Sequence, residues 1–257
     1  MTPIYGAHSH NPQSTSMALP PNCTLVEYAG VKLLVNVGLD SSSETIDPAN
    51  DQQQLPIPQD IDAILLCDAT LESLGGLPKY VSPKNCPNIP PIYATYPVIQ
   101  LGPMTLYDYH ANVSLDGRNP GFTLDDVDAL FTTAPHRDAE DENNGTFKGR
   151  FHTLKYSQSI PLTTDKSVTL TPHRSGHVVG GAYWILQRVA DETAIVIALT
   201  YNPAKELHLD ASTLLEYGGA PDVFVTRPGG LGGKLRVLYS GAYRTKSSQY
   251  GSLLYIF

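Results

Sequence analysis

The sequence predicts an α/β fold of the mixed α+β kind, in which strands and helices share one layered domain. A β-hairpin signal lies near the amino terminus, where Ala29-Gly30 separates the apolar runs 24–28 and 31–37. Further along the chain, short strand-like runs alternate with helical patterns. Strands that are first paired in a hairpin and then interleaved with helices favour a mixed sheet layered by helices over a helical bundle or a β-sandwich.

Composition narrows the class of protein. The chain has 257 residues, of which 41% are hydrophobic, so it can fill the core of one large domain or two small ones. A net charge of -8 argues against a wholly basic nucleic-acid surface but leaves room for a local basic patch. Cys23, Cys67 and Cys86 form no Cys-x-x-Cys pair, which favours a reducing compartment.

Hydrophobic periodicity predicts where the strands and helices lie. In the first half it predicts a strand over 61–66, a strand over 91–94, a helix over 98–113 and a helix over 124–131. Thr123 is the expected N-cap of the last helix, with Asp125 and Asp126 in its first turn. In the second half the pattern predicts strands over 154–156, 168–171, 182–186, 194–199 and 223–225, with a turn and short helix over 207–215. The polar stretches 40–58 and 136–149 are predicted loops.

Six blocks of sequence resemble the β-CASP branch of the metallo-β-lactamase family. They are KLLVNVGLD at 32–40, AILLCDATLESLGGLPKY at 63–80, IYATYP at 92–97, FTLDDVDALF at 122–131, LKYSQ at 154–158 and LTPHRSGHVVGGAYW at 170–184. The resemblance implies a metallo-β-lactamase-like αββα sandwich that is incomplete at the C-terminus. It divides the chain into a polar segment 1–23, the first part of that domain over 24–226, and a tail over 227–257.

The resemblance also implies a metal site that has lost its ligands. Active members of the family hold two zinc ions with two aspartates, a His-x-His-x-Asp-His turn and a later histidine. The corresponding degenerate positions here are Asn36, Asp68, Thr70, Glu72, Ser73, His177 and Thr200. One imidazole is retained, and neither an amide nor a hydroxyl supplies the negative charge that offsets a second dication. We therefore expect no catalytic residue, no bound metal and no cofactor, with His177 as a hydrogen-bonded structural residue.

Two functions follow from these residues. The resemblance implies a non-catalytic scaffold in the nucleus that assembles with other subunits of the pre-mRNA cleavage and polyadenylation machinery. Those partners include the active β-CASP endonuclease; contact with pre-mRNA is left open, and no membrane is involved. The alternative is a metal-dependent hydrolase or RNA endonuclease with a remodelled site around Asp68, Glu72 and His177, where the carboxylates could hold a hydrated hard cation.

The tail after Thr226 has two interpretations. Its basic residues have no acidic neighbours and alternate with tyrosines: Arg227, Lys234, Arg236, Arg244 and Lys246, with Tyr239, Tyr243, Tyr250 and Tyr255. Such a composition can contact RNA through phosphate attraction and base stacking. The resemblance stops abruptly at this point, however, and the tail has little helical or strand periodicity. We favour an out-of-family ending, as from a truncated or mis-spliced gene, over a selected RNA-binding tail.

Overall fold

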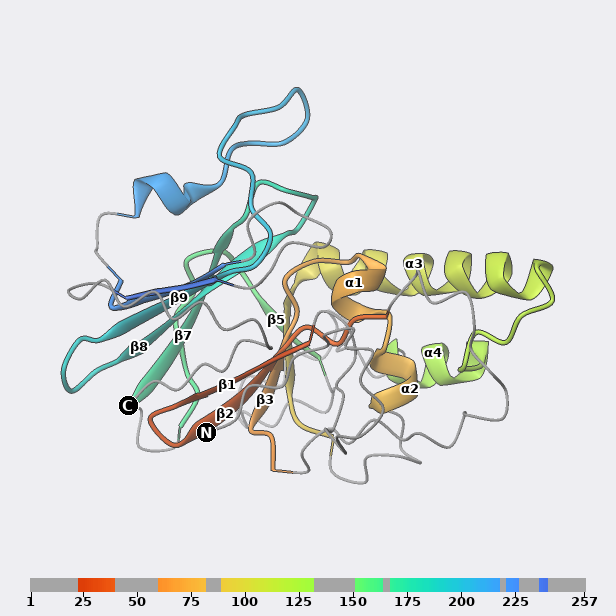
Figure 1. Cartoon of the computed structure of the whole chain (residues 1–257), viewed down its shortest axis with the longest axis horizontal. Helices are drawn as coiled ribbons and strands as arrows, with labels where there is room; N and C mark the ends of the chain where they lie inside the picture. Colours follow the sequence, from red (N-terminus) through yellow and green to blue (C-terminus); the bar gives the residue numbers. More distant parts are fainter. Residues whose placement is uncertain are drawn as a thin grey trace, which may run out of the picture.

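Two mixed β-sheets pack face to face, and helices cover one of them (Figure 1). The computed structural model describes residues 23–39, 60–81, 89–131, 151–163, 167–217, 221–226 and 236–239. The first sheet has the strand order β1-β2-β3-β4-β5, and the second has the order β11-β10-β9-β8-β7-β6. The mixed fold class expected from the sequence is confirmed.

The first sheet begins with the predicted hairpin. Its strands are β1 (Thr24–Tyr28), β2 (Val31–Val35), β3 (Ala63–Leu65), β4 (Ile92–Thr95) and β5 (Phe151–Leu154). Ala29 and Gly30 both have positive φ, of 50° and 81°, which is the backbone shape that a two-residue hairpin turn requires. β1 and β2 are antiparallel, whereas β2 to β5 run parallel. The carboxyl ends of these parallel strands therefore meet at one edge of the sheet.

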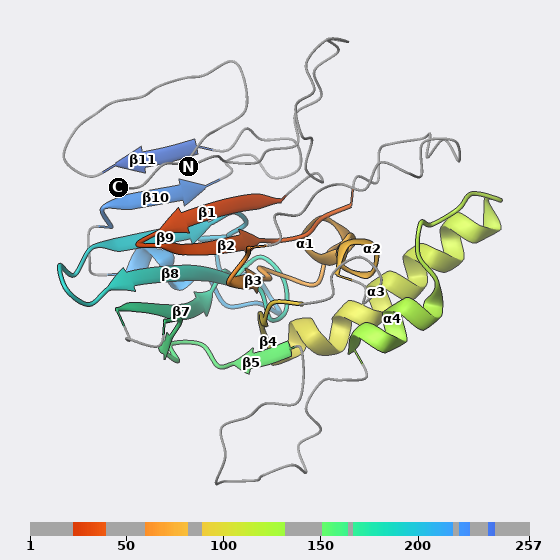
Figure 2. The same cartoon turned by 90° about the horizontal axis from the view of Figure 1, so that it is seen from below.

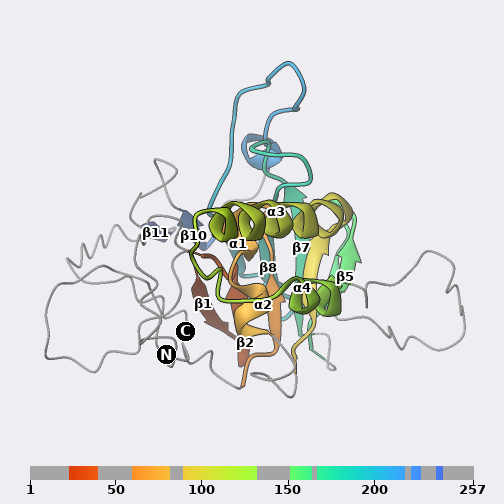
Figure 3. The same cartoon turned by 90° about the vertical axis from the view of Figure 1, so that its right-hand side faces the viewer.

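The helices lie on the outer face of the first sheet (Figure 3). They are α1 (Leu71–Leu74), α2 (Leu77–Tyr80), α3 (Tyr96–Leu115) and α4 (Leu124–Phe131). The two long helices are confirmed, as is the cap of α4. The Asp126 N–H donates to Thr123 Oγ1 at 3.2 Å, and the Thr123 N–H donates to an Asp126 carboxylate oxygen at 3.0 Å. Within the residues described, none of the helices has the length and apolar character needed to cross a membrane.

The second sheet is antiparallel except where β9 and β10 run parallel. Its strands are β6 (Ile160–Pro161), β7 (Val168–Arg174), β8 (Ala182–Arg188), β9 (Ala194–Ala198), β10 (Val223–Thr226) and β11 (Arg236–Tyr239). On its outer face, a small cluster around Tyr183 and Val196 packs against Leu214 of the 3-10 helix η2 (Thr213–Glu216). In the described part of the chain, η2 is the only helical element of this outer layer.

The alternation of side chains along each strand builds the layers. In β2, Leu33 and Val35 face the second sheet, where they share a core with Trp184 and Leu186 of β8. Leu34 points the other way and packs in the core beneath the helices. Because the middle of the first sheet is covered on both faces, all three residues of β3 are apolar and buried, as expected of parallel strands covered on both sides.

One predicted strand was displaced. The strand expected over 154–156 lies over Phe151–Leu154 instead, because the chain turns at Ser157, whose φ is 63°. The turn and short helix expected over 207–215 are found as bends followed by the 3-10 helix η2, which the Ser212 side chain caps.

Regular structure was not expected in the tail after Thr226, yet Arg236–Tyr239 forms β11 antiparallel to β10. Pairing with a neighbouring strand, rather than periodicity, places those residues. The segment 1–22 and the predicted loops 40–58 and 136–149 lie outside the described residues.

Candidate site at the carboxyl ends of the strands

Three of the seven expected site positions lie within three residues of the carboxyl end of a strand. Asn36 comes after β2, Asp68 lies three residues beyond β3, and Thr200 lies two residues beyond β9. In open sheets of parallel strands, ligands bind at the carboxyl ends. Three of the positions that the sequence assigned to one site therefore lie at this end of the strands.

Asn36 ties the exit of β2 to the exit of β3. It is buried and has a φ of 61°, a left-handed conformation that asparagine tolerates better than most residues. Its N–H donates to the Leu65 carbonyl at 2.8 Å, and its Oδ1 accepts the Cys67 N–H at 2.9 Å. The side-chain oxygen at this position is thus engaged in holding two strands in register.

Asp68 is the best-defined polar residue of the site. Its side chain is buried, and the residue is 1% exposed. Oδ1 accepts the Thr70 N–H at 3.0 Å and the Thr70 hydroxyl at 2.6 Å, and Oδ2 accepts the Thr200 hydroxyl at 3.1 Å. Both carboxylate oxygens therefore have protein donors, and hydrogen bonds stabilise the carboxylate.

The other positions of the turn support its backbone. Thr70 is the N-cap residue of α1, and Glu72 lies in the first turn of that helix. Ser73 is buried, and its carbonyl accepts the Val37 N–H at 2.7 Å. These contacts join α1 to the chain that leaves β2.

His177 differs from the expected buried, hydrogen-bonded histidine. It is exposed, and the contact that the structure records for it is from its backbone N–H to Ser175 Oγ at 3.5 Å. Asp68, Thr70 and Thr200 are brought together, but no hydrogen bond within the described residues joins His177 to them. The direction of this side chain could not be read from the sequence, because flanking glycines allow many backbone paths.

The segment 175–181, which contains His177, is anchored by two residues that sequence reasoning missed. The Thr95 hydroxyl donates to the Gly180 carbonyl at 2.6 Å, and the Tyr156 hydroxyl donates to the Gly181 carbonyl at 2.9 Å. Burial raises the pKa of Tyr156, with nearby Arg174 opposing the shift, so the phenol keeps its proton for this bond. Both residues lie in the blocks that carry the family resemblance, which was the available signal.

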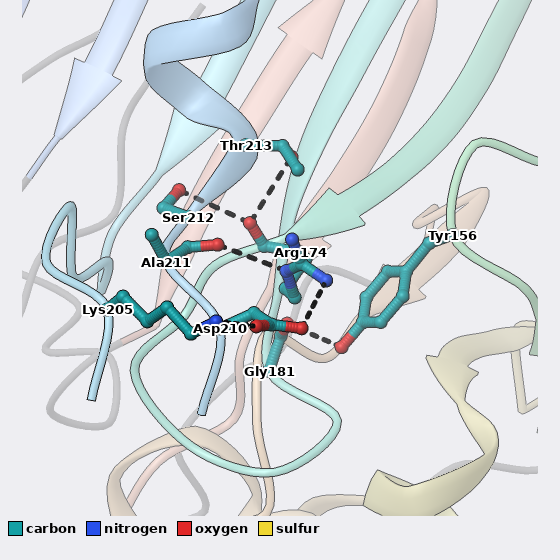
Figure 4. A network of polar contacts seen from close by, with 8 residues as sticks. All are labelled: Tyr156, Arg174, Gly181, Lys205, Asp210, Ala211, Ser212 and Thr213. Atoms are coloured by element: carbon teal, nitrogen blue, oxygen red, sulfur yellow. Dashed lines mark hydrogen bonds and ion pairs between the residues drawn. The ribbon is translucent and has the colours of Figure 1, made fainter. Parts of the chain in front are cut away.

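A second network holds the segment 201–217 against the end of β7 (Figure 4). Arg174 Nε donates to the Ala211 carbonyl at 3.0 Å, and its Nη1 lies 3.3 Å from an Asp210 carboxylate oxygen. In return, the Arg174 carbonyl accepts the Ser212 hydroxyl at 3.2 Å. The ion pair is largely exposed and contributes little, so the backbone bonds fix the geometry.

These donor atoms do not fit a dinuclear zinc centre. Zinc is bound by imidazole, thiolate and carboxylate, whereas the residues gathered here are one amide, two hydroxyls and one carboxylate that already accepts three hydrogen bonds. Across the described ranges, no group of three or more His, Cys, Asp or Glu side chains is placed to hold a metal ion. The contact of Asp68 with Thr200 joins the two sheets, and the contact of Ser73 with Val37 joins α1 to the first of them.

The two-sheet fold and the polar residues at the carboxyl ends of its strands define the class of protein. Residues 25–231 match the family model described as a metallo-beta-lactamase superfamily domain, and the chain belongs to that superfamily.

Three curated relatives narrow the comparison. The chain is 32% identical over 216 residues to "Cleavage and polyadenylation specificity factor subunit 2" of Oryza sativa subsp. japonica, which is 83% of this chain and 25% of the relative. It is 31% identical over 218 residues to the Drosophila melanogaster protein named "Probable cleavage and polyadenylation specificity factor subunit 2", which again is 83% of this chain and 25% of the relative. The Arabidopsis thaliana relative, also named "Cleavage and polyadenylation specificity factor subunit 2", is 28% identical over 229 residues, which is 88% of this chain and 26% of the relative.

The resemblance expected from the sequence blocks is confirmed by these relatives. The chain spans about a quarter of their length. The comparison therefore concerns one part of a longer kind of protein.

Proposed function

We propose that this chain is a non-catalytic scaffold subunit in pre-mRNA cleavage and polyadenylation. It acts in the nucleus, where it assembles with other cleavage and polyadenylation factor subunits, among them the active β-CASP endonuclease. Two observations support the proposal: the relatives named as subunit 2 of the specificity factor, and the lack of a zinc-type donor set among the residues described at the strand ends. Contact with pre-mRNA is a separable part of the proposal.

The observation that carries the non-catalytic part is the contact of Asp68 with Thr70 and Thr200. Hydrolysis by this fold depends on a water held between two cations, whose charge must be offset by carboxylates. Here a hydroxyl stands at position 200, and it donates to the carboxylate of Asp68 at 3.1 Å. A site arranged in this way stabilises the folded chain and has no means of activating water.

An RNA cleavage assay tests the absence of catalysis. We expect the purified chain to leave a labelled RNA oligonucleotide intact with manganese, magnesium or zinc, as it does with a chelator. The Glu72→Ala and His177→Ala variants are the controls. Metal-dependent cleavage that both substitutions abolish would establish the hydrolase alternative and overturn the scaffold.

Affinity purification tests assembly. A tagged form of the chain is expressed in cells, and the known cleavage and polyadenylation subunits are quantified by mass spectrometry against a tag-only control. We expect these subunits to be enriched together. If the endonuclease and its companions are recovered no better than with the tag alone, the assembly part of the proposal is wrong.

A further inference from the structure

Helix α3 has an apolar stripe on the side opposite to the one that packs against the domain. Its buried residues are Val98, Ile99, Gly102, Leu106 and Val113. Along the other side, residues recur with alternating steps of four and three: Pro97, Leu101, Met104, Asp108, Ala111 and Leu115. We call these six residues the α3 seam. Their spacing is that of the a and d positions of a coiled coil, which place side chains along one line of a helix.

From Leu101 onward the α3 seam is exposed, whereas Pro97 at its start is partly buried beside Gly180. Met104 is 66% exposed, Leu115 is 84% exposed, and Leu101 is also classed among the exposed large hydrophobic residues. The solvent face of a surface helix is normally charged, yet Asp108 is the single Asp, Glu, Lys or Arg residue among the twenty of α3. Exposed apolar residues that are aligned in this way mark a contact surface more often than scattered ones do.

The position of α3 leaves room for another helix. Figure 2 shows α3 and α4 lying together and projecting beyond the ends of the strands. The Tyr107 hydroxyl contacts the Asp128 carboxylate and so fixes α4 along one flank of α3. A partner helix could then lie along the seam without displacing either sheet.

The charges around the α3 seam identify the chemistry of the partner. Asp108 lies within it, while Asp125 and Asp128 are exposed on neighbouring α4. From residue 96 to residue 131, the one lysine or arginine is Arg118, and it is paired with Asp116 at 2.6 Å. A second copy of this chain would bring like charges together, whereas a basic partner would be attracted.

We propose that the α3 seam docks a basic amphipathic helix of another protein. The partner helix presents apolar side chains at its own a and d positions and lysine or arginine beside them. The apolar residues supply affinity by burying Leu101, Met104 and Leu115. Asp108 faces one of the basic side chains and so fixes the register, as a single polar residue in a coiled-coil seam does.

Binding of two designed peptides to the full chain tests the proposal. Both peptides are helical with leucine at a and d; one has lysine at the flanking positions and the other has glutamate. Fluorescence anisotropy should show binding of the basic peptide only. Met104→Gln should weaken it at least about tenfold, as removal of a central apolar contact does, and Leu115→Gln, at the end of the seam, should weaken it by a smaller factor. Leu207→Gln, at a 97% exposed leucine outside the seam, is the matched control and should change nothing.

Other results would overturn the proposal. Equal binding by a basic peptide with scrambled a and d positions would mean that charge alone attracts it. Loss of binding in Leu207→Gln, or none in Met104→Gln and Leu115→Gln, would place the contact elsewhere. Self-association in sedimentation that Met104→Gln abolishes would assign the seam to a second copy of the chain. Thermal melts of the variants must match the parent, since these side chains are exposed.

Discussion

Asp68 shows at the scale of one residue how a buried carboxylate is stabilised by neighbouring protein donors. The Thr70 amide, the Thr70 hydroxyl and the Thr200 hydroxyl all donate to it. Hydrogen bonds to an ionised acceptor are about twice as strong as neutral ones, and a buried charge without them would be costly. The acid and its donors therefore depend on one another.

Removal of the Asp68 carboxylate or of the Thr200 hydroxyl should destabilise the fold. We expect Asp68→Ala to lower the free energy of unfolding by about 3 kcal/mol, because three donors lose their acceptor in a buried place. Thr200→Val keeps the size of the side chain but removes the hydroxyl donor, and it should lower the free energy of unfolding by about 1 kcal/mol. Urea denaturation measures both. If Asp68→Ala were neutral or stabilising, the carboxylate would be a strained remnant and not a structural group.

The sequence could predict which residues gather at the strand ends but not how they interact. Asn36, Asp68 and Thr200 were placed correctly near one another, because each follows a strand. That Asp68 bonds to Thr200, and that His177 is exposed, depends on side-chain directions set by tertiary contacts. The assignment of the seven positions to a lost metal site stays a prediction.

At the scale of elements, periodicity and caps predicted the long helices well. α4 begins and ends where the pattern of 124–131 placed it, with the Thr123 cap in place. Short elements were less well predicted, since a few residues carry little periodicity. β11 lies in a stretch without strand signal and forms by pairing with β10, which a local pattern cannot show.

The segment 175–181 needs glycine where it passes α3. Gly180 has a φ of 76°, and a Cβ there would lie 2.6 Å from Pro97 Cβ. We expect Gly180→Ala to lower the free energy of unfolding by about 3 kcal/mol, from backbone strain and overlap together. Gly30→Ala is the matched control, since its φ is 81° but nothing lies within 4 Å of the new Cβ, so its cost should be about 1 kcal/mol. Equal losses in the two denaturation curves would show that the Pro97 contact is unimportant.

Two half-buried histidines in the sheets should make stability depend on pH. Burial lowers the pKa of His173 and of His152 from the ordinary value of 6.5. Below 6.5 the unfolded chain binds more protons than the folded one, so stability is fully present above that pH and falls as the pH drops through the folded pKa values. The melting temperature should decrease on acidification from neutral pH.

His173→Phe tests the assignment, because a phenyl ring can keep the stack on Tyr183, whose centroid lies 5.3 Å from that of His173. The variant should lose part of the pH dependence, whereas His208→Phe, at an exposed histidine, should retain it. If the melting temperature of His173→Phe depended on pH as strongly as that of the parent, groups other than His173 would cause the pH dependence.

At the scale of the whole molecule, the two sheets share one core. Trp184, the sole tryptophan of the chain, is fully buried in this core with residues of both sheets. Tryptophan fluorescence and far-ultraviolet circular dichroism should therefore report a single unfolding transition with the same midpoint. Two separated transitions would show that the sheets unfold independently.

The outer layers are where the whole fold was hardest to predict. Helices on the first sheet follow from the alternation of strands and helices in the sequence. The outer face of the second sheet is covered, in the described residues, by η2 and its neighbours, whose irregular path has no periodic signal. Polar contacts such as those of Arg174 fix that path, and they join residues far apart in the sequence.

Metal analysis of the full chain, purified without added metal and without chelator, tests the central claim most directly. The amide, hydroxyl and hydrogen-bonded carboxylate at the strand ends should not retain zinc, so elemental analysis should find far less than one zinc per chain. Asp68→Ala should give the same result. Two equivalents of tightly bound zinc that are lost in Asp68→Ala would contradict this claim and would support a metal-dependent hydrolase.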